Sequence, residues 1–145
     1  MNDLTQAKPS IGPLTADRVE RVESIMLQLP QSDCPVKHRF GPGIYIREVF
    51  LPKGTLAVGH HHISPHMNVF LSGRLAMLAN DGKVVDMEAP MTFVSPAGRK
   101  IAYIIEDSVW QNIYPNPDGE QDIEKLEARW LKKSQTFLAN EAQKR

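Results

Sequence analysis

Residues 54–73 have the sequence GTLAVGHHHISPHMNVFLSG, which holds four of the five histidines in the chain. Its glycines, β-branched residues and proline disfavour a helix, so we expect two strands joined by a tight turn at the Ser-Pro pair. Side chains alternate between the two faces of a strand, so His60 and His62 share one face and His61 points to the other. His66 begins the next strand, where the turn can bring it opposite that pair.

Three imidazoles that meet at one point form a good site for a divalent transition metal. Neutral imidazole binds zinc, iron, nickel or copper, with manganese as a further candidate, so His60, His62 and His66 are the predicted ligands. Three protein ligands leave coordination positions open, which is typical of catalytic rather than structural sites. The alternatives are an exposed patch that binds metal only adventitiously, or histidines that pack as hydrogen-bonded polar groups.

Short β-rich runs also lie on both sides of the histidines, within residues 41–118. Turn signals separate these runs, and Asp81-Gly82 is a strong hairpin signal. Many short, evenly spaced strands predict an all-β sandwich or barrel, and the lack of strand–helix alternation disfavours a parallel sheet. The expected strands are 44–51, 55–63, 67–71, 74–79, 83–87, 92–94, 101–105 and 109–114.

Helical patterns flank the expected barrel. Over residues 15–29 apolar side chains recur at helical spacing, Thr15 can cap the first turn, and Pro30 follows as a stop signal. Residues 31–40 are expected to be irregular. An apolar stripe within residues 119–145 predicts a second helix that covers the barrel or binds a neighbouring subunit. The predicted organisation is an N-terminal arm with a helix (1–40), a barrel (41–118) and a C-terminal helix (119–145).

Composition narrows the classes of function. The 145 residues suffice for one domain, and 17 Lys and Arg balance 17 Asp and Glu. A formal net charge of zero disfavours nucleic acid as a partner and is compatible with a homo-oligomer. The single cysteine, Cys34, excludes an internal disulfide and fits a reducing compartment. No signal pattern opens the chain and no apolar run reaches the length of a membrane span, so we expect a cytoplasmic protein without a membrane partner.

The histidine stretch resembles the first motif of the cupin superfamily. That motif is Gly, five residues, His-x-His, three or four residues, Glu, six residues, Gly. The chain has Gly54, His60, His62, His66 and Gly73 at these spacings, with histidine in place of the glutamate. The resemblance implies that the first two histidines are metal ligands and that the third takes the place of the carboxylate.

The second cupin motif is matched only at its centre. It reads Gly, five residues, Pro-x-Gly, two residues, His, three residues, Asn. Pro96 and Gly98 match, whereas Pro90, Ile101 and Ile105 replace the first glycine, the histidine and the asparagine. The family's fourth metal ligand is therefore absent.

The cupin resemblance covers residues 41–114 and implies a mainly-β jelly-roll barrel, often dimeric, here flanked by a helix at each end. A metal held by three neutral imidazoles keeps its full charge, which favours anionic ligands and acidifies bound water. One expected function is therefore metal-dependent chemistry on a small molecule, of the oxygenase, isomerase or hydrolase type.

Residues 42–48, 89–98 and 106–110 are similar in texture to small cupin-like proteins of tailed bacteriophages. This resemblance implies a second function, a non-catalytic oligomeric scaffold that binds a ligand, a virion protein or a host protein. Such a protein would work in the host cytoplasm or in the virion. The sequence leaves open whether the protein is an enzyme.

Further side chains are candidates for a pocket. Asn68 shares the strand face of the third histidine and can orient a ligand or bond within the core. Glu48 shares a face with two isoleucines, so it can be an inward acid–base group or a surface carboxylate in an ion pair. Tyr103 can place a phenol near the metal or belong to the core. Arg99 and Lys100 follow a turn, where we expect them to be solvated, with an anionic substrate as the alternative.

Overall fold

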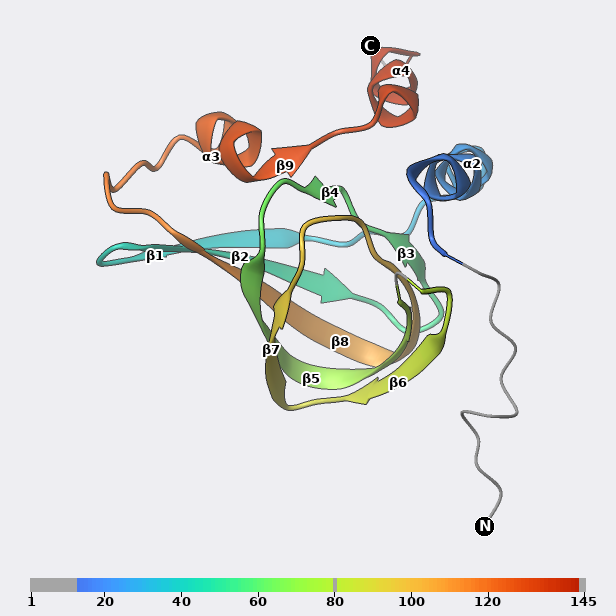
Figure 1. Cartoon of the computed structure of the whole chain (residues 1–145), viewed down its shortest axis with the longest axis horizontal. Helices are drawn as coiled ribbons and strands as arrows, with labels where there is room; N and C mark the ends of the chain where they lie inside the picture. Colours follow the sequence, from blue (N-terminus) through green and yellow to red (C-terminus); the bar gives the residue numbers. More distant parts are fainter. Residues whose placement is uncertain (1–12, 80, 144–145) are drawn as a thin grey trace.

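The computed structural model describes residues 13–79 and 81–143. A strongly curved antiparallel sheet closes around an interior, and the helices lie at one end of it (Figure 1). The elements in chain order are α2 (Ala16–Met26), β1 (Val36–Gly41), β2 (Ile44–Leu51), β3 (Leu56–Val58), β4 (His61–His62), β5 (His66–Leu78), β6 (Val84–Glu88), β7 (Met91–Ser95), β8 (Ile101–Pro115), α3 (Ile123–Trp130), β9 (Leu131–Lys132) and α4 (Gln135–Gln143).

Two long strands, β5 and β8, build the barrel. They pair with each other, and each changes its other partner along its length. β8 pairs with β3 through its first residues and with β2 through its second half, while β5 pairs with β7 first and with β6 later. Every pairing is antiparallel, so one continuous sheet supplies both walls of a jelly-roll barrel. The prediction of a mainly-β barrel with flanking helices is confirmed.

The sequence prediction separates strands 67–71 and 74–79 by a turn at Ser72-Gly73, but this pair is a bulge within β5. The register of β5 against β8 shifts on both sides of Ser72, so the chain bends without leaving the sheet. Gly73 has a φ of 103°, and a Cβ atom there would overlap Ser108 and the carbonyl of Asp107. Glycine is therefore required at the point where β5 curves past β8. The two strands expected over 101–105 and 109–114 are likewise one strand, β8.

Other boundaries differ from the sequence prediction in three places. Residues 36–41, expected to be irregular, form β1, which pairs with β2. The strand expected over 55–63 is divided into β3 and β4. The single C-terminal helix is two helices, α3 and α4, because β9 interrupts them and pairs with the histidine strand β4.

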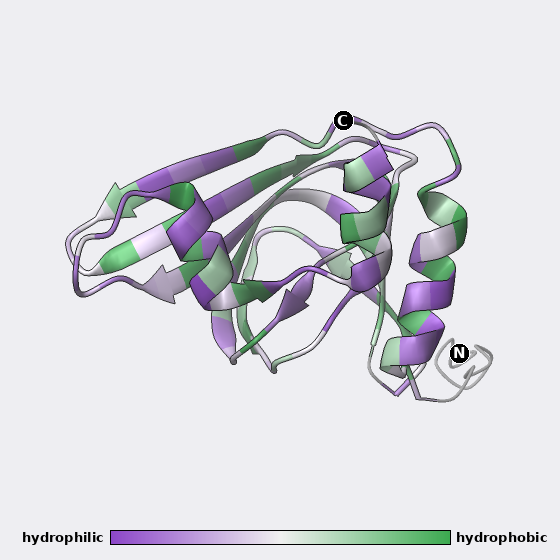
Figure 2. Cartoon of the chain, turned by 90° about the horizontal axis from the view of Figure 1, so that it is seen from above, coloured by the Kyte–Doolittle hydropathy of each residue, from purple (hydrophilic) through white to green (hydrophobic). Residues whose placement is uncertain are grey.

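The helix α2 begins where the sequence predicts. The side chain of Thr15 accepts a hydrogen bond from the backbone N–H of Arg18, which caps the first turn. α2 contacts α4, and Figure 2 shows the two helices near each other beside the barrel. None of the helices in residues 13–79 and 81–143 is long and apolar enough to cross a membrane.

Two apolar clusters hold these parts together. The first lies inside the barrel, and the second packs α3 against the start of β2 and the end of β8. The buried members of the first are Phe70, Leu75, Met87, Ala102, Ile104 and Trp110, and those of the second are Tyr45, Tyr114 and Leu126. The first cluster does not fill the whole interior, because Leu75, Ala102 and Trp110 also line a cavity.

Candidate functional site

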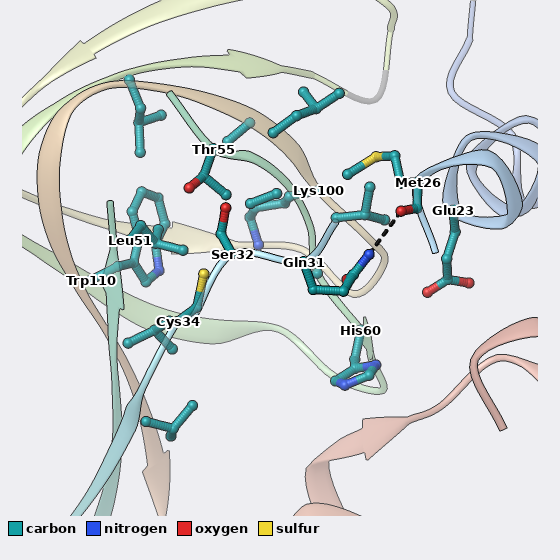
Figure 3. A pocket seen from close by; sticks show the side chains of 18 of the residues that line it. Glu23, Met26, Gln31, Ser32, Cys34, Leu51, Thr55, His60, Lys100 and Trp110 are labelled. Atoms are coloured by element: carbon teal, nitrogen blue, oxygen red, sulfur yellow. Dashed lines mark hydrogen bonds between the residues drawn. The ribbon is translucent and has the colours of Figure 1, made fainter. Parts of the chain in front are cut away.

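A cavity of about 510 Å³ lies between the barrel interior and the flanking helices. Strands β2, β3, β5 and β8 form its inner walls, while α2, the segment after it, and Phe137 of α4 close its outer side. Figure 3 shows Ser32, Cys34 and Lys100 pointing into this space. Most of the lining side chains are apolar, which is typical of a site for a small organic molecule.

Lys100 brings an amine into this apolar cavity. No ion pair and no side-chain hydrogen bond of Lys100 is found in the part of the chain that the structure describes. Burial lowers the pKa of the amine to about 8, because an apolar environment disfavours the charged form. At pH 7 the group is still mostly protonated, so the cavity contains a cation without a counter-charge. The expected solvated position of Lys100 is therefore wrong.

Arg99 is not solvated either, because it is buried in an ion pair. Its Nη2 atom lies 2.6 Å from Oε2 of Glu23 on α2, and its Nε donates to the carbonyl of Gly59. Ser134 also donates a hydrogen bond to Glu23. Burial opposes the ionisation of Glu23, but the hydrogen bonds from Arg99 and Ser134 outweigh it and lower the pKa of the carboxyl. This cluster joins α2, the barrel and the start of α4 beside the cavity.

The structure brings two of the three predicted metal ligands together. The rings of His62 and His66 stack with centroids 4.1 Å apart and an angle of 17° between their planes. Nδ1 of His62 shares a 2.7 Å hydrogen bond with the hydroxyl of Tyr114, and Nδ1 of His66 donates to the carbonyl of Ser64 at 3.0 Å. The backbone carbonyl only accepts, so Nε2 carries the lone pair when His66 is neutral.

The ring contact of His60 is with a residue outside the stack of His62 and His66. Its ring meets that of Phe137 on α4 edge-on, with centroids 4.7 Å apart, and both residues line the cavity. Burial lowers the pKa of His60 to about 4 and that of His62 to about 2, so both rings are neutral near pH 7. Nδ1 of His60 and Nε2 of His66 are buried and have no hydrogen-bond partner among the residues that the structure describes.

This arrangement differs from the predicted convergence of three imidazoles on one point. The lone pair of a ring nitrogen lies in the ring plane, and the planes of His62 and His66 are separate and nearly parallel, which disfavours a single point shared by both lone pairs. Residues 13–79 and 81–143 contain no group of three or more His, Cys, Asp or Glu side chains placed to hold a metal. The predicted convergence of His60 with the other two is not seen.

Two of the predicted pocket residues lie outside the cavity. Glu48 faces outward, where it accepts hydrogen bonds from Arg39 at 3.0 Å and from Gln111 at 2.8 Å. The inward interpretation was wrong because β2 turns its other face to the interior, where Tyr45 is 1% exposed. Tyr103 is 51% exposed on β8, so neither a role beside the histidines nor a core position holds for it.

Asn68 is fully buried at the centre of a polar network, and its short hydrogen bonds are to side chains. Its Oδ1 accepts from Trp110 Nε1 at 3.0 Å and from Asn112 Nδ2 at 2.7 Å. Its Nδ2 donates to Ser95 Oγ at 2.6 Å. Trp110 and Asn112 line the cavity, so this network forms part of the wall of the pocket.

Sequence reasoning missed the contribution of residues 26–34 to the pocket. Met26, Gln31, Ser32 and Cys34 line its outer side, although they belong to a helix end and an irregular segment. No periodicity marks such a segment, because its side chains are positioned by contacts with the barrel. Arg47 was also missed as a lining residue, since its place depends on which face of β2 is inward.

Similarity to known proteins is confined to structure. No family model and no curated protein matches the chain. Similar solved structures include a cupin-2 domain containing protein from Shewanella frigidimarina, with 13% identity and a TM-score of 0.43 over 66% of this chain and 92% of the other. Another is the cupin_2 domain of an XRE family transcriptional regulator from Enterobacter cloacae, with 19% identity and a TM-score of 0.47 over 59% and 100%.

A third similar structure is an RmlC-like cupin family protein from Methanocaldococcus jannaschii, with 15% identity and a TM-score of 0.45 over 61% of this chain and 85% of the other. These proteins carry the superfamily name that the histidine motif resembles. At such identities and TM-scores they say nothing about the site, so the functional interpretation depends on the geometry of this chain.

Proposed function

We propose that this protein binds a small, largely apolar organic anion in the cavity, with Lys100 holding the anionic group. The observation that carries the proposal is the unpaired amine of Lys100 inside an apolar cavity. An ammonium group withdrawn from water without a partner is costly, and an anion that enters the cavity offsets that cost. The apolar walls then receive the rest of the molecule.

The other charged groups around the cavity support a ligand of this sign. Glu23 is committed to Arg99 and Ser134, so its carboxylate is not free for Lys100. Arg47 also lines the cavity, but Glu127 offsets its charge from 3.6 Å, so the charge without a partner is that of Lys100. His60 and His62 are neutral near pH 7 and add no charge. The balance of charge that faces the cavity is therefore positive.

The test is titration with a fluorescent aryl sulfonate and with a series of medium-chain carboxylates, each beside its uncharged primary amide. We expect the wild type to prefer the anion, and Lys100→Met to bind it at least about tenfold more weakly. Lys83→Met is the matched control, because Lys83 is exposed and does not line the cavity. Equal affinity of the wild type and Lys100→Met for the anion, or no binding of any member, would overturn the proposal.

Metal binding by His60, His62 and His66 is a second candidate function. The buried, unpaired Nδ1 of His60 and Nε2 of His66 support it, whereas the stacked rings speak against it. The test is elemental analysis of protein purified without an affinity tag. About one equivalent of zinc, iron, nickel, copper or manganese, lost in His60→Ala/His62→Ala, would establish the site, and metal-free protein would dismiss it.

The scaffold hypothesis concerns partners rather than the cavity. A homo-oligomer, a virion or host protein partner, a phage gene and a cytoplasmic location all stay predictions from the sequence. Light scattering tests the first of them, and the genes beside this one test the phage origin. A monomer in solution would remove the reason to regard the barrel as an assembly unit.

A further inference from the structure

The polar network behind the cavity fixes the orientation of two amide side chains. An indole Nε1–H can only donate a hydrogen bond, so the atom of Asn68 that lies 3.0 Å from Trp110 Nε1 must be the oxygen. The amide nitrogen of Asn68 then faces Ser95 Oγ, at 2.6 Å. Asn68 and Ser95 are 0% and 2% exposed, so water does not compete for these bonds.

The orientation of Asn68 determines that of Asn112. The oxygen of Asn68 lies 2.7 Å from one end of the Asn112 amide, and an oxygen accepts only from a donor. Asn112 must therefore turn its NH₂ group toward Asn68 and its Oδ1 away from it. A rotation of the Asn112 amide by 180° would place two carbonyl oxygens in contact, so the arrangement is fixed by Trp110 through Asn68.

The oxygen of Asn112 is left without a protein partner. Asn112 lines the cavity, and its Oδ1 has no hydrogen bond to any residue in 13–79 or 81–143. It is the acceptor of an oriented amide on β8, a rigid strand that pairs on both sides with β2 and β5 at this position. Water in the cavity can donate to this oxygen when the site is empty, but a ligand that displaces the water without a donor of its own leaves the acceptor unpaired, which is costly. The site therefore favours a bound group that donates a hydrogen bond.

We infer that Oδ1 of Asn112 accepts a hydrogen bond from the ligand, so the bound molecule carries an O–H or N–H donor in addition to its anionic group. The inference rests on the proposed function and specifies the ligand class further, as a hydroxylated or amino-substituted organic acid. Lys100 selects the charge, and Asn112 selects among acids of the same charge. Loss of the ligand's donor leaves the Asn112 oxygen unpaired, which is an effective way to reject an analogue.

The experiment compares matched acids that differ by one hydroxyl group. The probes are a medium-chain carboxylate, its positional hydroxy isomers, 3-phenylpropionate and its three ring-hydroxylated derivatives. We expect at least one hydroxylated acid to bind the wild type about five- to tenfold more tightly than its parent. Asn112→Leu should remove this preference while the parent acid still binds.

Two variants of Asn68 separate recognition from structural support. Asn68→Asp keeps an oxygen toward Trp110 and Asn112, so the preference for the hydroxylated acid should survive. Asn68→Leu removes the group that orients Asn112, so the preference should shrink although Asn112 is present. A purely structural role for Asn112 would instead weaken the parent acid and the hydroxylated acid by the same factor, and that result overturns the inference.

The outcomes also separate the inference from the proposed function. If the parent acids bind through Lys100 and no hydroxylated acid binds more tightly, the inference is wrong and the proposed function stands. If the preference persists in Asn112→Leu, the hydroxyl is recognised elsewhere and the inference is again wrong. If no acid binds the wild type at all, the proposed function fails and the inference fails with it.

Discussion

Arg99 and Lys100 are adjacent cations that enter different surroundings. Arg99 reaches outward from the barrel to Glu23 on α2 and forms a short, buried ion pair. Lys100 turns into the cavity, where the described residues supply no counter-charge. One charge therefore holds the structure together and the other is available to a ligand. The difference shows that burial alone does not indicate function, whereas a buried charge without a partner is suited to hold a ligand of opposite charge.

The largest expected effect comes from breaking the ion pair of Arg99. Arg99→Met leaves the carboxylate of Glu23 buried without its main partner, so we expect the free energy of unfolding to fall by about 3–5 kcal/mol. Urea denaturation measures this loss. The double variant Glu23→Met/Arg99→Met should recover much of it, because no unpaired charge is left. A loss below about 1 kcal/mol in Arg99→Met would show that the pair is structurally unimportant.

The next largest effect is the change in affinity for an anion as Lys100 loses its charge with rising pH. Its pKa of about 8 makes the amine mostly charged at pH 7 and mostly neutral at pH 9. We therefore expect an organic anion to bind about tenfold more weakly at pH 9 than at pH 7, since the unprotonated amine has no attraction for it. Lys100→Met should lack this pH dependence, and Lys83→Met should keep it. A flat profile in the wild type would contradict the role of Lys100.

A smaller effect is expected on stability without ligand. The unpaired ammonium opposes folding at pH 7, so Lys100→Met should be about 1 kcal/mol more stable than the wild type. The pKa of Lys100 falls from 10.5 to about 8 on folding. Below pH 8 both states are protonated and the full penalty is present. Between pH 8 and 10.5 the unfolded state binds more protons, so the wild type gains stability as the pH rises.

The free energies of unfolding of the wild type and Lys100→Met can be compared by urea denaturation across this pH range. The advantage of Lys100→Met should narrow as the pH rises above 8. A constant difference from pH 7 to pH 10 would mean that the amine is not desolvated by folding.

The smallest effect is expected at the surface pair of Arg39 and Glu48. Their shortest contact, 3.0 Å, resembles that of the buried pair, but the side chain of Arg39 is 52% exposed. Water and salt screen such a pair, so Arg39→Met should change the free energy of unfolding by about 0.5 kcal/mol or less. Measuring the free energy of unfolding of Arg39→Met and Arg99→Met under the same conditions isolates the effect of burial on an ion pair. A comparable loss of stability in the two variants would show that burial does not make the difference.

Much of the barrel could be predicted from the sequence. The run 44–51 has the observed bounds of β2, and Thr15 caps α2 as its position suggests. The Ser72-Gly73 pair was misinterpreted, because serine and glycine suit a turn and a bulge equally. Contact with Asp107 and Ser108, far along the chain, decides between them. Such a contact has no signature in the local sequence.

The histidine site was predicted less well for a specific reason. Strand alternation was extended through residues 58–62, whereas β3 ends at Val58 and β4 begins at His61. His60 lies in the break, so the two-residue period does not hold there, and its ring meets Phe137 instead. Lys100 was misplaced because the turn before it directs the chain into the barrel. The orientation of a side chain beside a turn depends on backbone angles that composition does not reveal.

The pairing of β9 with β4 has a consequence for biosynthesis. β9 follows all seven strands of the main sheet in the chain, and Ser134, which bonds Glu23, follows β9. A ribosome therefore delivers the complete barrel while the histidine strand still lacks its neighbour. The histidine strand and the outer side of the cavity can therefore be completed only after every strand of the main sheet has been made.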